Sequence, residues 1–289
     1  MSAAAIPHDH SHAGDHAHDH HEPSWLYKYI FSTDHKVIGV QYGISGLLFL
    51  LFGFFLMMVM RWTIAYPGEP MPGLQALQFL PFFDGFIEKF APGGIVTPEL
   101  YNMFGAMHGT IMVFMGIVPL GFAAFGNFVM PLQIGAIDMA FPKLNAWSFW
   151  LFFLGGAMMM ASFFLPTGAA QTGWTNYSPL ATTTHLIVKN TFMTGQTWWL
   201  LAMVLVISSS LLGSVNFITT LINLRAKGLS FMRLPFFCWA MLVTSFLLLL
   251  AFPPLEVAAV LQVVDRIFGS SVFLPTGLVE GTKHFDISG

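Results

Sequence analysis

The hydrophobic and polar positions of this chain are grouped in blocks, and the apolar blocks are long. A helix needs about 20 mostly apolar residues to cross a bilayer. Five runs of roughly that length or more cover residues 37–60, 102–133, 147–166, 197–223 and 234–264. None of them alternates apolar and polar residues as the strands of a membrane barrel do. The pattern predicts an all-α fold, a polytopic membrane bundle of about five transmembrane helices.

The composition agrees with a protein embedded in membrane lipid and argues against other classes. Hydrophobic residues make up 55% of the chain and charged residues 9%, far from the balance of a soluble domain. The net charge of -3 comes without a basic cluster, which argues against nucleic acid as a partner. Cys238 is the single cysteine, so the chain cannot form an internal disulfide or a thiolate metal site.

The first 27 residues differ from the rest because they are rich in histidine and aspartate. We expect a disordered tail at residues 1–27, since it has too little apolar surface for a core, and a membrane domain at residues 28–289. Two interpretations of the tail stay open, namely capture of copper or zinc by its imidazoles and a solvated or tag-like extension. Its seven histidines are His8, His10, His12, His16, His18, His20 and His21.

One histidine, His108, lies inside the second apolar run, in the sequence GAMHG. Gly105 and Gly109 remove side chains beside its imidazole and leave room for a flat macrocycle, while nearby Met, Phe and Ile residues provide an apolar wall. A histidine within the membrane can also hydrogen-bond a neighbouring helix without binding a cofactor. The spacing by itself leaves both interpretations open.

Residues 101–150, YNMFGAMHGTIMVFMGIVPLGFAAFGNFVMPLQIGAIDMAFPKLNAWSFW, carry a wider resemblance. They resemble the second and third spans of the catalytic subunit I of haem-copper cytochrome c oxidases, and the likeness extends over about residues 28–280. It implies the first five spans of the subunit I fold. In that family the histidine of this motif is an axial ligand of the low-spin haem, so the resemblance implies that His108 binds haem iron, with haem A as the expected cofactor.

The resemblance assigns further cofactor-binding residues. Arg61, followed by Pro67 and Gly68, matches an arginine that bonds the periphery of the low-spin haem, although it could also be an interfacial arginine whose head reaches water. Trp174 and Tyr177 belong to the sequence GWTNYSPL, which resembles a family loop that packs over the haem propionates. As interfacial aromatics they could instead be simple membrane anchors.

A third group of polar residues surrounds the loop after the second run. Asp138 is flanked by Asn127 and Asn145, whose amides could order a file of water. A carboxylate in a short loop is usually just solvated. The resemblance instead implies the mouth of a proton pathway, to which the same comparison adds Tyr42, Ser209 and Ser210.

The fifth run departs from the family pattern. Glu256 and Gln262 stand where the family has apolar residues, and an unpaired carboxylate costs at least about 2.5 kcal/mol at mid-membrane. Glu256 is therefore expected to be protonated, paired or near a membrane edge. The departure is interpreted as either a local adaptation or a relaxed constraint.

The resemblance also implies what this chain needs. The ligands of copper B and of the high-spin haem, and the second ligand of the low-spin haem, are expected to follow residue 289, so the chain alone is expected to be inactive. Three interpretations are open. The chain is an amino-terminal part of subunit I, completed by a carboxyl-terminal half, or a shortened noncatalytic paralogue in a respiratory supercomplex, or a relative from quinol oxidases or nitric oxide reductases.

The expected partners and location follow from the same resemblance. They are a subunit II bearing copper A, a subunit III, and cytochrome c or another respiratory complex as electron donor. A bacterial cytoplasmic membrane is expected. Arg225, Lys227 and Arg233 lie in one short loop and favour a cytoplasmic amino terminus, as the family does.

Overall fold

The computed structural model of the chain describes residues 24–77, 79–80, 83–178, 180–181, 191–270 and 272–273. The chain divides into two compact units, Met1–Ser32 and Thr33–Gly289. The described part of the first unit contains one short helix, α1 (Trp25–Tyr29). The seven tail histidines lie outside the described residues, so the expectations for that tail stay predictions.

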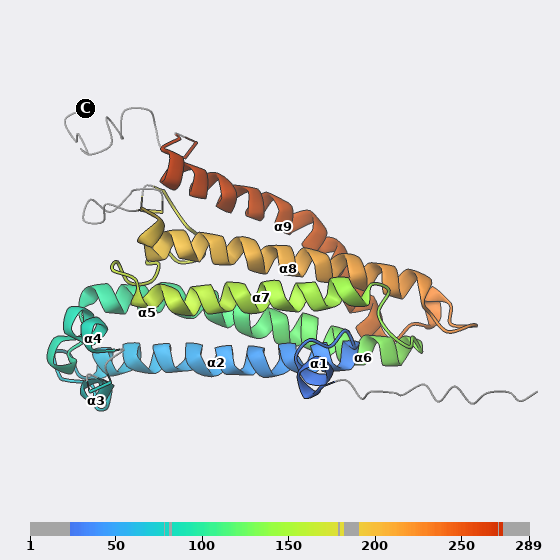
Figure 1. Ribbon diagram of the computed structural model, residues 1–289, viewed down its shortest axis with the longest axis horizontal. Helices are drawn as coiled ribbons and strands as arrows, with labels where there is room; N and C mark the ends of the chain where they lie inside the picture. The colour runs from blue at the N-terminus through green and yellow to red at the C-terminus, as the bar shows by residue number, and fades with distance from the viewer. Residues whose placement is uncertain are drawn as a thin grey trace, which may run out of the picture. The chain divides into compact units, whose positions relative to one another are not determined.

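The described part of the second unit contains five helical segments that are long and apolar enough to span a membrane, which confirms the predicted helical membrane bundle (Figure 1). The first is α2 (His35–Ala65). The second, Pro98–Ile134, is continuous but changes its helix type along its length. The other three are α7 (Pro142–Ala161), extended by the 3₁₀ turn Ser162–Phe164, then α8 (Gly195–Asn223) and α9 (Phe236–Phe268).

The second span begins as an α-helix, widens to a π-helix and returns to an α-helix. Its parts are α5 (Pro98–Thr110), the π segments η2 (Ile111–Ile117) and η3 (Pro119–Ala124), and α6 (Phe125–Ile134). In a π-helix the hydrogen bonds run from residue i to residue i+5, an arrangement that is rare and often found at functional sites. The apolar pattern does not predict it, because nearly every residue of this stretch is apolar and no face is distinguished.

Four of the five spans begin a few residues before the predicted boundaries, and polar side chains cap two of them, α2 and α5. The carboxylate of Asp34 accepts the Lys36 amide at 2.7 Å, which starts α2. Thr97 Oγ1 accepts the Leu100 amide at 3.2 Å, and a proline follows it in the first turn of α5. These groups satisfy amides that have no partner within the helix.

The connection between α2 and α5 contains short helices. They are α3 (Leu74–Leu77), α4 (Asp84–Phe90) and the 3₁₀ turn η1 (Pro92–Gly94). Ile87 and Phe90 of α4 are buried, and Thr97 Oγ1 donates to the Phe90 carbonyl at 2.8 Å. Further 3₁₀ turns, η5 (Thr191–Met193) and η6 (Phe231–Arg233), precede α8 and α9.

Helix α8 lies between α7 and α9 and packs against both, while α2 runs beside the second span (Figure 1). Small residues permit the closest approaches. A Cβ placed on Gly155 of α7 would lie 2.8 Å from Val206 Cγ2 and 2.9 Å from the Ala202 carbonyl oxygen, both on α8. Small residues at such contacts let helix backbones approach closely in membranes.

We expect the substitution Gly155→Ala to lower the free energy of unfolding by about 1–3 kcal/mol, because the added methyl group meets backbone that cannot move aside. The matched control is Gly213→Ala on α8, where a Cβ would have no atom within 4 Å. Reversible unfolding in mixed micelles measures both. Equal stability of the two variants would contradict this account of the α7–α8 contact.

Candidate functional site

His108 is held by a hydrogen bond between two spans. Its Nδ1 lies 2.8 Å from the Gly53 carbonyl oxygen on α2. Because a carbonyl oxygen accepts and cannot donate, Nδ1 carries the proton of this bond, and Nε2 is the nitrogen that presents a lone pair in the neutral imidazole. Histidines that bind metals through one ring nitrogen commonly donate the other N–H to a backbone carbonyl, which fixes the tautomer and the ring orientation. His108 has the arrangement of an oriented metal ligand.

Gly109 leaves open space next to the half-buried His108 imidazole, whereas Gly105 is packed against Met60. A Cβ on Gly109 would meet no atom within 4 Å, and one on Gly105 would lie 3.3 Å from Met60 Cε. No group of three His, Cys, Asp or Glu side chains that could hold a bare metal ion occurs in the described part of the chain. A haem needs no such group, since its macrocycle supplies four ligands and the protein supplies axial ones. The residues around His108 are therefore compatible with a haem whose iron His108 would bind.

The other three residues expected at the haem are exposed. Arg61 lies on α2, and its side chain is exposed. The Trp174 indole is 55% exposed and its ring packs against Phe114 at a centroid distance of 6.0 Å. Tyr177 is 76% exposed. Their expected contacts with haem propionates stay predictions.

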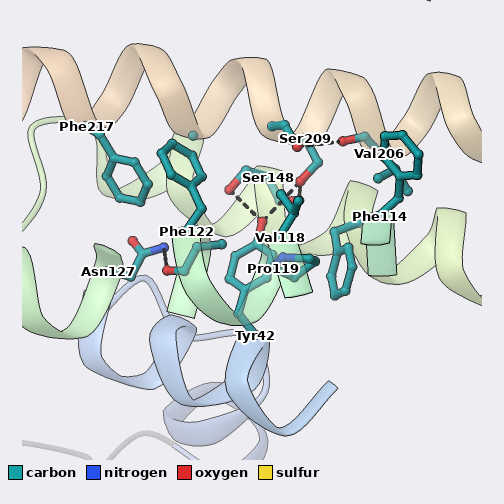
Figure 2. Close-up of a pocket in the computed structure, with 14 residues that line it drawn as sticks. Tyr42, Phe114, Val118, Pro119, Phe122, Asn127, Ser148, Val206, Ser209 and Phe217 are labelled. Atoms are coloured by element: carbon teal, nitrogen blue, oxygen red, sulfur yellow. Dashed lines mark hydrogen bonds between the residues drawn. The ribbon is translucent and has the colours of Figure 1, made fainter. Parts of the chain in front are cut away.

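A buried cluster of hydroxyl groups joins three spans (Figure 2). The Tyr42 hydroxyl from α2 donates to Ser148 Oγ on α7 at 3.1 Å and lies 3.1 Å from Ser209 Oγ on α8. Ser209 Oγ donates to the Ser148 carbonyl at 2.6 Å. The structure thus brings Tyr42 and Ser209 together, as a shared pathway requires. The connecting residue, Ser148, was not predicted from the sequence.

A cavity of about 20 Å³ adjoins this hydroxyl cluster. Such a volume holds about one water molecule. Ser210 lines the cavity, although its hydroxyl donates to the Val206 carbonyl of its own helix at 3.1 Å. Asn127 and Phe122 line the cavity as well, and Figure 2 shows their side chains next to each other. Polar and aromatic walls therefore enclose a space beside the hydroxyls.

The two asparagines expected in the pathway are buried with polar atoms unpaired. Asn127 Nδ2 donates to the Ala123 carbonyl at 2.8 Å, but its Oδ1 has no hydrogen-bond partner among the described residues. Neither side-chain polar atom of Asn145 has a partner there. Buried polar groups in proteins are nearly always hydrogen-bonded, to protein or to ordered water. Both amides are thus placed to bind water.

A second histidine, His35, contacts this region and was not singled out from the sequence as a functional residue. It is buried at the first position of α2, and its Nδ1 donates to the Asn127 carbonyl oxygen at 2.7 Å. The bond ties the start of α2 to α6. Its signal in the sequence is weak, because a histidine beside the capping residue Asp34 looks like an ordinary helix start.

Asp138 lies half-buried in the loop between α6 and α7. Its Oδ1 accepts the amide of the next residue, Met139, at 2.7 Å. The loop is fixed to α8, because the amides of Ala140 and Phe141 donate to side chains of that helix at 2.9 Å. Asp138 makes no direct bond to Asn127 or Asn145 in the described structure, so the water-bridged network expected of the three stays a prediction.

Comparison with known proteins identifies related sequences. The family model described as Cytochrome C and Quinol oxidase polypeptide I matches residues 37–285. Cytochrome c oxidase subunit 1 of Thermostichus vulcanus is 41% identical over 251 residues, which are 87% of this chain and 40% of that protein. The subunit 1 proteins of Synechocystis sp. and Cereibacter sphaeroides are 40% and 36% identical. These matches cover 90% and 92% of this chain and 41% and 47% of those proteins, so the chain spans less than half the length of these relatives.

Proposed function

Because this chain belongs to the cytochrome c and quinol oxidase polypeptide I family, we propose that it is part of the catalytic subunit I of an aerobic terminal oxidase. The family and the five apolar spans make it an integral membrane protein. The proposed reaction is the reduction of oxygen to water with electrons from cytochrome c or another respiratory complex. Its role would be to hold the low-spin haem and to admit protons.

The observation that carries this proposal is the bond between His108 Nδ1 and the Gly53 carbonyl oxygen. It holds the imidazole in the tautomer whose Nε2 can bind iron, and Gly109 leaves space beside it. Haem A, when bound, would supply one-electron transfer. Arg61, Trp174 and Tyr177 would steady its negative propionates with positive charge and N–H or O–H donors.

The proposed proton pathway starts at Asp138 and continues through the buried amides and hydroxyls. The unpaired polar atoms of Asn127 and Asn145 support binding of water between the loop and the bundle. The Tyr42–Ser148–Ser209 cluster and the cavity that Ser210 also lines support a continuation toward the middle of α8. Each hydroxyl can accept one proton and donate another, which proton relay requires.

The remaining parts of the proposed enzyme would come from other residues or subunits. Ligands of copper B and of the high-spin haem would belong to a carboxyl-terminal half of subunit I, and copper A to subunit II, beside a subunit III. We place the complex in a bacterial cytoplasmic membrane. The short α8–α9 loop with Arg225, Lys227 and Arg233 supports a cytoplasmic amino terminus.

Co-expression with a complementary half tests the proposed function. The 289-residue chain is purified alone and together with the carboxyl-terminal half of subunit 1 from a relative. We expect the pair to show a low-spin haem with two histidine ligands and to consume oxygen with reduced cytochrome c. The chain alone should do neither, because one iron ligand from His108 is insufficient for a six-coordinate low-spin centre.

The controls for this experiment separate assembly from chemistry. A pair carrying His108→Ala should assemble without the low-spin spectrum, as judged by size and by haem content. Oxygen consumption by the 289-residue chain alone would contradict the proposed division of ligands. A correctly assembled pair without any low-spin haem would contradict the role of His108.

A further inference from the structure

A carboxylate lies near the middle of the fifth span. Glu256 is four residues past the midpoint of α9, which places it about 6 Å from the middle of the helix. Its side chain is half-buried, while the next residue, Val257, is 56% exposed. Carboxylates at this depth are rare, and they often mark sites where protons bind or move.

The partner of this carboxylate is a hydroxyl on the neighbouring span. Ser208 Oγ of α8 donates to Glu256 Oε1 at 2.5 Å. Helices α6 and α8, the turn η5 and the loop around Trp174 and Asn176 pack against α9, and none of these described segments carries a cationic side chain. On α9 itself, the nearest ionisable residues are Asp265 and Arg266, more than two turns away. No cation therefore faces Glu256 in the described structure.

The free-energy cost of burial favours the neutral form of the Glu256 side chain over the ionised form. An ionised carboxylate at this depth would have one hydroxyl donor and no opposite charge, which does not replace the water that it loses. A neutral carboxylic acid loses far less on leaving water. It also keeps the bond observed here, because its carbonyl oxygen accepts the Ser208 proton as a carboxylate oxygen would.

A route for proton exchange lies one residue away along α8. Ser209 belongs to the buried cluster with Tyr42 and Ser148, beside the cavity that can hold about one water. Ser208 and Ser209 are adjacent, so Glu256 on one side of α8 and the hydroxyl cluster on another are separated by about one residue of backbone. Hydroxyl groups and one water are the components of a short proton relay.

We propose that Glu256 is a proton-binding site within the membrane, a neutral carboxylic acid held by Ser208 and exchanging its proton with the buried hydroxyl cluster. On release, the carboxyl O–H bond breaks, its electron pair stays on the carboxylate, and the proton passes to a water molecule. Rebinding reverses these steps. The site goes beyond the proposed function, because it requires neither haem at His108 nor proton entry at Asp138.

Infrared difference spectroscopy on the full chain in lipid tests the protonation state. The spectrum should contain a protonated-carboxyl C=O band that disappears in Glu256→Gln and moves to higher frequency in Ser208→Ala, because the carbonyl loses its hydrogen bond. Thr219→Ala is the matched control, since Thr219 is on the same helix and donates to the Val215 carbonyl of that helix. It should leave the band unchanged. A band that is identical in the chain and in Glu256→Gln would overturn the proposal.

Two further measurements keep the result independent of folding and of the oxidase function. In heavy water the C=O band should move to lower frequency, and this exchange should be slower in Tyr42→Phe, which removes one hydroxyl of the cluster.

Dicyclohexylcarbodiimide, an apolar reagent for protonated carboxyls, should label Glu256 in peptide maps but not the exposed Asp84. Labelling of neither residue, or exchange unaffected by Tyr42→Phe, would count against the site even in a chain that supports oxygen reduction. Conversely, a band and a label at Glu256 in a chain without oxidase activity would support it.

Discussion

The substitution His108→Ala is expected to abolish the low-spin haem signal of the assembled oxidase. Alanine has no nitrogen to bind iron, and the Gly53 carbonyl loses the group that it orients. No nearby imidazole replaces it, because the other histidine in a described span is His35. Reduced-minus-oxidised optical spectra and electron paramagnetic resonance, normalised to protein, measure the loss. Oxygen consumption should fall with the signal.

The matched control is His35→Gln. His35 is also buried on a span, but it lies eighteen residues before Gly53 on α2, about 27 Å along the helix. This variant should keep the low-spin spectrum even where proton transfer slows, since His35 bonds the Asn127 carbonyl. A low-spin spectrum unchanged by His108→Ala, or lost equally in both variants, would remove the basis of the ligand assignment.

The substitution Asp138→Asn is expected to slow oxygen reduction by the assembled enzyme on the order of 100-fold, a typical effect of removing a positioned proton-transfer group. The amide keeps the size of the side chain and can still accept the Met139 amide, so the loop should keep its fold. It cannot collect a proton from water. Stopped-flow measurement of proton uptake by a pH-sensitive dye reports the step directly.

Asp84→Asn provides the comparison for this result. Asp84 is an exposed carboxylate in the first turn of α4, in the connection at the other end of α2 from His35. It should leave proton uptake unchanged. Undiminished uptake in Asp138→Asn would show that protons enter elsewhere, whatever the state of the haem.

The sequence predicted the spans well because burial in lipid imposes one simple requirement on every residue of a span. The predicted run 197–223 matches α8 within two residues, and 234–264 matches α9 within four. Larger differences arise where polar residues belong to the helix. The five residues from Pro142 to Ala146 precede the run at 147, yet they form the first turns of α7.

Contacts between spans were harder to predict, because a pattern along one helix does not specify its rotation against the next. Ser148 shows the difficulty. In sequence it is a small residue in an apolar run, and its role depends on Tyr42, which is 106 positions away. Its position three residues after Asn145 places both on one face of α7, a signal that becomes useful once Asn145 is thought to be functional.

For the Asp138 group, the sequence suggested which residues belong together, but not how they are connected. The spacing of Asp138, Asn127 and Asn145 suggested a common network, and the structure buries both amides without giving them partners in its described part. Direct bonds do not join them. A water file leaves no mark in the sequence other than polar residues at its walls, so its presence depends on the shape of the space between helices.

The π segments between Ile111 and Ala124 connect the His108 end of the second span with the Asn127 end. Along an α-helix, removal of one residue turns everything that follows by about 100°. A deletion between these points would leave enough apolar length for a membrane span. It would nevertheless rotate the Asn127 amide away from the cavity while His108 stayed against Gly53. The number of residues between the two ends therefore fixes how the His108 face and the Asn127 face of one helix are rotated against the same bundle.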